Sequence, residues 1–78
     1  PVAYLRDHLK LQGHDVQWVD PFVDNWEGAP PAADFIDFDV AILAVNQPGI
    51  DLNEILSQQI PILDCTNSYS NALGVTSL

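Results

Sequence analysis

The stretch VAILAV, residues 40–45, is the clearest indication of the fold in this sequence. An uninterrupted apolar run of this length is typical of a strand that is buried on both faces, as in a parallel sheet covered by helices. Asp51 and Glu54, shortly after it, have the spacing of a helix N-terminus and predict a helix over residues 51–59. A second short apolar strand is predicted over residues 60–64. Strand, helix and strand in this order predict a parallel pair joined by a helical crossover.

The residues on either side extend this pattern. Residues 1–12 predict a helix that ends at Gly13, and residues 14–19 predict a strand that ends before Pro21. The alternation of helices with buried strands predicts an α/β fold, in which a parallel sheet flanked by helices forms a truncated, Rossmann-like three-layer domain. Because the order begins on a helix, we expect a leading strand to be missing. A further weak strand is predicted over residues 74–78.

Length and composition allow one domain. The chain has 78 residues, 47% of them hydrophobic and 17% charged, which suits a folded core rather than disorder. It begins with Pro1 and contains no methionine, so we expect residues 1–78 to be a single partial domain of a longer protein. The single cysteine excludes a disulfide framework and, with two distant histidines, a tetrahedral zinc site.

The chain is strongly acidic. Eleven acidic residues stand against two basic ones, Arg6 and Lys10, for a formal net charge of −9. This balance excludes a nucleic-acid-binding surface and disfavours anionic membranes, since both need basic residues. No apolar run approaches the roughly 20 residues of a membrane span. Six of the acids lie within residues 20–39, where we expect a solvated loop with one short helical turn over residues 32–36 rather than a metal site.

Polar residues follow each predicted strand at its carboxyl end. Ligands of open parallel sheets bind at that edge. The residues that the predicted topology places there are Asp20, Asn46, Asp64, Thr66 and Asn67. We therefore predict that these side chains form a binding site for a polar ligand. The alternative left open is that each of them only caps a strand or a turn, as Asp and Asn commonly do.

No residue is predicted to be catalytic. Cys65 carries a nucleophilic thiol, but no His, Lys or Arg stands near it in the sequence to activate it. Asp51 and Glu54 are accounted for as a helix cap, so no carboxylate pair at helical spacing remains for acid–base work. The sequence also has no glycine-rich loop of the kind that cradles phosphate. We expect these residues alone to oxidise no substrate.

Residues 1–23, PVAYLRDHLKLQGHDVQWVDPFV, resemble the signature of the C-terminal domain of the UDP-glucose/GDP-mannose dehydrogenase family. In that family a Ser-Pro pair opens a helix, and Gly-x-x-Val and Asp-Pro-x-Val follow it. The matching residues here are Pro1, Gly13, Val16, Asp20, Pro21 and Val23. FDVAILAV, residues 38–45, and PILDCTN, residues 61–67, are similar to later strands of the same domain, and IDLNEI resembles the helix between them.

The resemblance implies a function for the longer protein. Family members oxidise the C6 alcohol of a nucleotide sugar to a carboxylate, with two NAD and a covalent thiohemiacetal and thioester on a cysteine outside this domain. The resemblance further implies that the longer protein is a cytoplasmic enzyme of polysaccharide biosynthesis that binds nucleotide sugar and NAD. The other partners are the remaining domains of the parent chain, and homo-oligomerisation of the parent is left open. Thr66 stands where the family commonly has arginine, so we expect part of the phosphate-binding set to be absent.

Two other interpretations stay open. A dinucleotide-binding Rossmann half typically has the same order: a helix, a Gly-His-x-Val stretch and then an acid. In that interpretation the acid is Asp20, which would bind the ribose hydroxyls of NAD. Pro21 counts against this interpretation, because it stiffens the turn that would approach the ribose. The second alternative is a non-enzymatic, acidic α/β interaction module.

Overall fold

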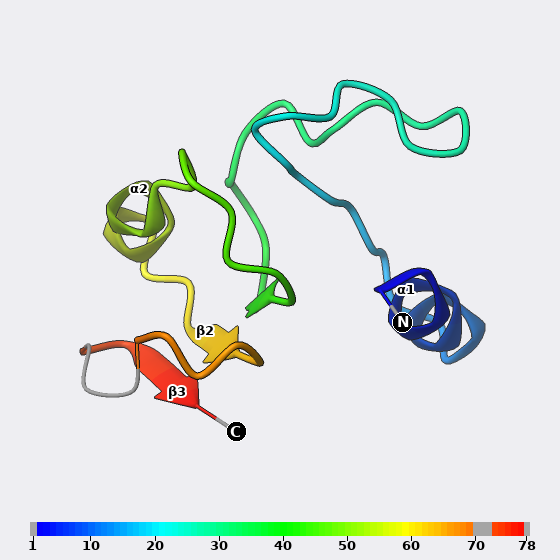
Figure 1. Ribbon diagram of the computed structural model, residues 1–78. Coiled ribbons are helices and arrows are strands. Elements are labelled where there is room, and N and C mark those ends of the chain that lie inside the picture. Colours follow the sequence, from blue (N-terminus) through cyan, green and yellow to red (C-terminus); the bar gives the residue numbers. More distant parts are fainter. Residues whose placement is uncertain (1, 70–72, 78) are drawn as a thin grey trace.

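The molecule contains a three-stranded parallel sheet, which lies on the side away from the N-terminal helix (Figure 1). The structure is a computed structural model that describes residues 2–69 and 73–77. Its elements, in chain order, are α1 (Val2–Leu11), β1 (Ala41–Leu43), α2 (Leu52–Ser57), β2 (Ile62–Asp64) and β3 (Val75–Ser77). The strands lie in the order β1-β2-β3, and both neighbouring pairs are parallel. The predicted α/β class is confirmed, as is the parallel pairing of the strands predicted over residues 40–45 and 60–64.

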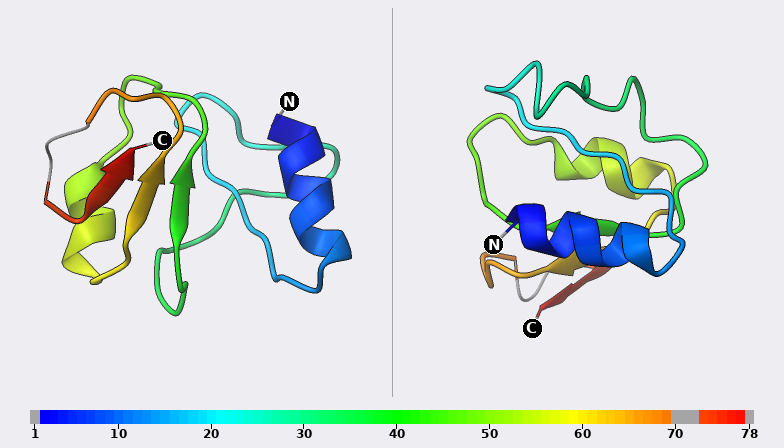
Figure 2. Two further views of the ribbon diagram at one scale, coloured as in Figure 1. Left: turned by 90° about the horizontal axis from the view of Figure 1, so that it is seen from below. Right: turned by 90° about the vertical axis from the view of Figure 1, so that its right-hand side faces the viewer.

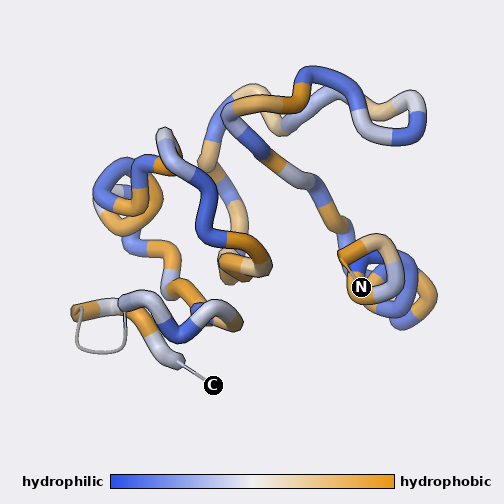
Figure 3. The backbone as a smooth tube through the Cα atoms, viewed as in Figure 1, coloured by the Kyte–Doolittle hydropathy of each residue, from blue (hydrophilic) through white to orange (hydrophobic). Residues whose placement is uncertain are grey.

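The core lies between the sheet and α2. Its buried members are Leu43, Ile55, Ile60 and Ile62. Ile62 occupies the centre of the sheet, where it pairs with Ala41 of β1 and Val75 of β3. Figure 2 shows α2 lying across one face of the sheet, and Figure 3 shows hydrophobic residues on the strands and on α2. Burial of these aliphatic side chains is the main force that holds the helix on the sheet.

α2 begins as the sequence predicts. Asp51 is its N-cap, and the Asp51 Oδ1 atom accepts a hydrogen bond from the Glu54 backbone N–H at 3.2 Å. Ile50, just ahead of the cap, packs against the same core as Ile55. The helix is shorter than the predicted range because Gln58 closes it and the next residue turns to a positive φ of 61°.

α1 confirms the helix predicted over residues 1–12, of which residue 1 lies outside the described residues, and it ends in a glycine cap. Gly13 has a φ of +91°, and the backbone N–H groups of Gly13 and His14 donate to the carbonyl oxygens of Lys10 and Leu9 at 3.0 and 3.2 Å. This pair of bonds is a Schellman motif, which satisfies the last carbonyl groups of the helix. No residue of α1 is buried, so this helix contributes little to the core.

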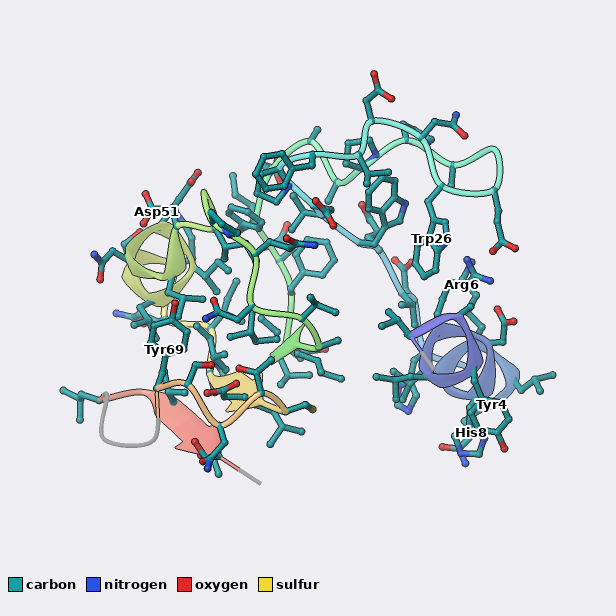
Figure 4. The ribbon with its side chains drawn as sticks, in the orientation of Figure 1. Tyr4, Arg6, His8, Trp26, Asp51 and Tyr69 are labelled. Atoms are coloured by element: carbon teal, nitrogen blue, oxygen red, sulfur yellow. The ribbon has the colours of Figure 1, made fainter. Side chains whose placement is uncertain are left out.

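Arg6 joins α1 to the long loop that precedes β1. Its guanidinium carbon lies 4.2 Å from the centroid of the Trp26 ring, and its nitrogen atoms contact the carboxylates of Asp7 and Glu27 (Figure 4). These two carboxylates, Asp7 foremost, raise the pKa of Arg6 above its ordinary value, so the guanidinium stays charged. Trp26 in turn meets Trp18 edge-on, with ring centroids 5.8 Å apart. The stack formed by Arg6, Trp26 and Trp18 therefore attaches α1 to the loop.

Removing the Trp26 ring is expected to release α1. Trp26→Ala deletes the face on which Arg6 lies and the edge-on contact with Trp18, a type of contact worth about 0.5–1.5 kcal/mol beyond its buried area. Amide hydrogen exchange of residues 6–11 should become several-fold faster, while Ile62 in the sheet keeps its protection. Trp26→Phe retains an aromatic face and should keep most of the protection. Equally fast exchange in the two variants would contradict this role of the indole.

The strand predicted over residues 14–19 is wrong. In the described part of the chain these residues belong to no sheet, and their main-chain contact to a distant residue is a hydrogen bond from the Ala32 N–H to the Trp18 carbonyl at 2.8 Å. The alternation of Val16 and Trp18 gives the right local pattern, but a strand also needs a neighbour with a matching ladder. β1 pairs with β2 and not with this segment.

Of three smaller predictions, two need revision and one is confirmed. The helical turn over residues 32–36 is wrong, because Asp34 Oδ1 accepts the Ile36 backbone N–H at 3.0 Å and holds a local turn in place of a helix. The run at residues 40–45 is not buried on both faces, since Val40 and Val45 are 52% and 48% exposed. The strand predicted over residues 74–78 is confirmed as β3, while residue 78 lies outside the described residues.

Candidate functional site

Asp64, at the carboxyl end of β2, is the best-connected side chain of the described residues. It is 0% exposed, and its carboxylate accepts four hydrogen bonds. Oδ1 accepts the backbone N–H of Thr66 at 2.8 Å and the Thr66 hydroxyl at 2.6 Å. Oδ2 accepts the backbone N–H groups of Ser68 and Tyr69, both at 2.8 Å. The carboxylate therefore folds the following loop, residues 65–69, around itself.

The electrostatics of Asp64 follow from these bonds. Burial alone would raise the pKa of the Asp64 carboxyl, but the hydrogen bonds from Thr66, Tyr69 and Ser68 outweigh it and lower that pKa below its ordinary value of 3.8. Hydrogen bonds to a charged acceptor are about twice as strong as neutral ones. Because both oxygens are already occupied, Asp64 acts as the organiser of the loop rather than as a general base.

Tyr69 links this loop to the loop that follows β1. Its hydroxyl donates to Asn46 Oδ1 at 3.1 Å, so the carboxyl ends of two neighbouring strands share one hydrogen-bonded network. Figure 4 shows Tyr69 between α2 and β3. The sequence analysis missed Tyr69, since nothing in the spacing of an aromatic residue five positions after Asp64 marks it as part of a site.

The loop presents neutral polar groups toward solvent. The hydroxyl oxygens of Thr66 and Ser68 lie 2.8 Å apart, next to Asp64. Asn67 is exposed and has a positive φ of 59°, a conformation that asparagine tolerates better than most residues. Hydroxyl and amide groups held in this way can donate to and accept from an uncharged polar ligand.

Asp20 lies in a separate turn. Its Oδ1 accepts the Phe22 backbone N–H at 2.8 Å, and its carbonyl oxygen accepts the Val23 N–H at 3.2 Å. The turn packs against the loop after β1. A Cβ atom added at Gly49 in that loop would lie 3.3 Å from the Pro21 ring. A cleft of about 230 Å³ lies along this contact, lined by Val19, Pro21, Phe35, Gly49, Ile50, Asp51, Glu54 and Ile55.

The structure therefore brings some of the predicted site residues together and leaves one of them in a separate turn. Asp64 and Thr66 are directly bonded, Asn67 belongs to the same loop, and Asn46 connects to that loop through Tyr69. Asp20 lies in a separate turn, and its neighbour Pro21 approaches Gly49 in the loop after β1. The prediction that all of them form one site stays a prediction.

The described residues restrict the chemistry of this edge. Residues 2–69 and 73–77 hold no cluster of three or more groups that could bind a metal ion, and none of their helices could cross a membrane. Cys65 has an exposed thiol, and its backbone N–H donates to the Leu43 carbonyl at 3.0 Å. The chain's two basic residues, Arg6 and Lys10, both lie in α1, so no cation follows any strand. The edge can therefore hydrogen-bond a ligand but cannot neutralise a phosphate.

Fold and site together define a small parallel α/β domain with a polar edge at the carboxyl ends of its strands. Comparison of the chain with protein-family models, with curated proteins and with solved structures found no significant match.

Proposed function

We propose that this chain is the nucleotide-sugar-binding domain of an NAD-dependent dehydrogenase of the UDP-glucose/GDP-mannose type. The observation that carries the proposal is the network at the strand ends, where Asp64 orders the loop of residues 65–69 and Tyr69 ties it to Asn46. Open parallel sheets bind their ligands at this edge. In the parent enzyme the chain would form part of a Rossmann-like three-layer domain.

A second feature supports the same proposal. The most specific part of the family resemblance is Asp20-Pro21-x-Val23. In the structure these residues form a hydrogen-bonded turn that lies against Gly49, in the loop that also carries Asn46. The stretch that resembles the family signature thus lies next to a loop of the candidate site.

The chemistry of the edge indicates which part of the ligand it would contact. Ribose hydroxyls and the amide edge of a nucleotide base are neutral donors and acceptors, which match the groups of Asn46, Asn67 and Ser68. The diphosphate would need cations, and these must come from other domains of the parent. NAD and the catalytic cysteine also belong to the parent, so residues 1–78 bind substrate without oxidising it.

Asn67→Ala tests this assignment. Loss of one neutral hydrogen bond costs roughly 0.5–1.5 kcal/mol. The dissociation constant for UDP-glucose or GDP-mannose, measured by calorimetry on the parent protein, should therefore rise by at most about tenfold. Gln58→Ala is the matched control, because it removes an exposed amide next to the amino end of β2 and should leave the constant unchanged.

Three outcomes would overturn the proposal. An unchanged constant in Asn67→Ala would mean that this residue only shapes its loop. A parent protein that binds no nucleotide sugar, or forms no NADH from NAD and nucleotide sugar, would exclude the dehydrogenase. Binding of NAD to residues 1–78 that is abolished by Asp20→Ala would instead favour the dinucleotide-binding Rossmann half.

A further inference from the structure

The cleft of about 230 Å³ beside α2 opens onto the hydrophobic core. Its deepest residue is Ile55, which is buried and belongs to the core. Ile50 and Phe35 also line the cleft, are half-buried and pack against the same core. Val19 forms part of the wall and is 46% exposed. An apolar group placed in the cleft would therefore continue the core outward and remove these side chains from water.

The segments that line the cleft carry further exposed apolar side chains. Phe22 and Val23, which follow Pro21, are 68% and 39% exposed, and Ile36, which follows Phe35, is 55% exposed. A group of exposed apolar residues around a cleft is typical of a surface that binds another protein. The volume favours the same interpretation. Sites for drug-sized ligands enclose roughly 300–1,000 Å³, whereas about 230 Å³ suits a single large side chain of a partner.

The rim of the cleft is acidic. Asp51 and Glu54 both line it, and both are exposed. Asp51 caps α2 by accepting the Glu54 backbone N–H, but within the described part of the chain neither carboxylate forms an ion pair. The chain's two basic residues, Arg6 and Lys10, lie in α1, on the opposite side of the molecule from α2 (Figure 1). A cation at this rim therefore comes from another molecule.

We propose that this cleft binds a separate protein through a short basic segment, in which an aromatic side chain fills the cleft and a neighbouring arginine contacts Glu54. Aromatic and arginine side chains are the commonest anchors of protein interfaces. The leading strand expected before Pro1 is not this partner, because a strand joins a sheet through its backbone and no residue of β1, β2 or β3 lines the cleft. A second copy of the chain is disfavoured, because each copy carries a formal net charge of −9.

A peptide added to residues 1–78 tests the docking. The probe is acetyl-GRFRG-amide, and NMR follows the methyl signals of the protein during the titration. A phenylalanine ring seated in the cleft should shift the methyl signals of Val19, Ile50 and Ile55 through its ring current. The signals of Ile42, in β1 and outside the cleft, should stay in place. Replacing the phenylalanine of the peptide by alanine should raise the dissociation constant by about tenfold, because less apolar surface is buried.

Glu54→Gln tests the acidic rim. The substitution keeps the cap of α2, which uses the Glu54 backbone N–H. It should raise the dissociation constant by about two- to fivefold, as expected for an exposed ion pair, and this effect should shrink as salt is added. Asp15→Asn removes the same charge from an exposed residue outside the cleft and should leave the constant unchanged. A peptide with glutamate in place of both arginines removes the ion pair from the other side and should not bind.

Four results would overturn the proposal. Unshifted methyl signals of Ile50 and Ile55 would mean that no aromatic side chain enters the cleft. An equal effect of Glu54→Gln and Asp15→Asn would reduce the binding to attraction by the net charge. Binding to residues 1–78 but not to the parent protein would mean that the parent's own residues cover the cleft. Shifts that appear without peptide as the protein is concentrated, and disappear in Lys10→Gln, would assign the cleft to α1 of a second copy.

Discussion

Ile62→Ala is expected to lower the free energy of unfolding by about 2–5 kcal/mol, the usual range for truncating a buried isoleucine. Ile62 is 2% exposed and pairs on both sides within the sheet, so the cavity left by its side chain would lie at the centre of the core. A chain of 78 residues has little stability to spare, so this single change should leave much of the protein unfolded at room temperature. Urea unfolding followed by circular dichroism measures the difference.

Two variants show whether the effect comes from the core. Ile62→Val removes one methylene at the same place and should cost about 0.5–1.5 kcal/mol. Ile36→Ala removes a side chain that is 55% exposed in the long loop and should change stability by less than about 0.5 kcal/mol. A loss for Ile62→Ala no larger than that for Ile36→Ala would contradict the assigned core.

The parts of the fold that the sequence predicts are those with local signals. The apolar run at residues 40–45 and the cap at Asp51 each carry their information within a few positions, and β1 and α2 lie where these signals place them. Gly13 likewise predicts the end of α1, since its positive φ is a requirement of the helix cap itself.

The predictions that were wrong depend on contacts between residues far apart in the sequence. Residues 14–19 alternate like a strand, but whether they form one depends on a partner that the alternation does not encode. The contacts made there instead, Trp18 on Trp26 and Trp26 on Arg6, join residues far apart in sequence. No local pattern identifies such a stack.

In the candidate site, too, the sequence predicts where residues lie but not which contacts they make. Asp64 and Thr66 are predicted by position, since they follow a strand at its carboxyl end. That Asp64 is buried and holds the whole loop together is visible only in its hydrogen bonds, and so is the part played by Tyr69. Position thus predicts which residues lie at the edge, whereas their roles depend on how the loop closes.

Asp64→Asn is expected to destabilise the protein more than any other conservative change of a polar residue. The substitution keeps the shape of the side chain but replaces one acceptor oxygen by an N–H₂ group. That group would face N–H donors of Thr66, or of Ser68 and Tyr69, which then lose their acceptor in a buried site. The midpoint of thermal unfolding at pH 7 should fall by roughly 10 °C. Asp24→Asn, an exposed acid of the long loop, is the control and should shift it by little.

The pH dependence distinguishes the charge of Asp64 from its shape. Because folding lowers the pKa of this carboxyl below its ordinary value of 3.8, its contribution to stability is present above that value. The contribution is lost as the pH falls through the lower pKa of the folded state. The midpoints of thermal unfolding of the unmutated protein and of Asp64→Asn should therefore differ most at pH 7, and their difference should begin to shrink as the pH falls below about 4. A difference that stays the same from pH 7 to pH 3 would mean that the ionised carboxylate is not what orders residues 65–69.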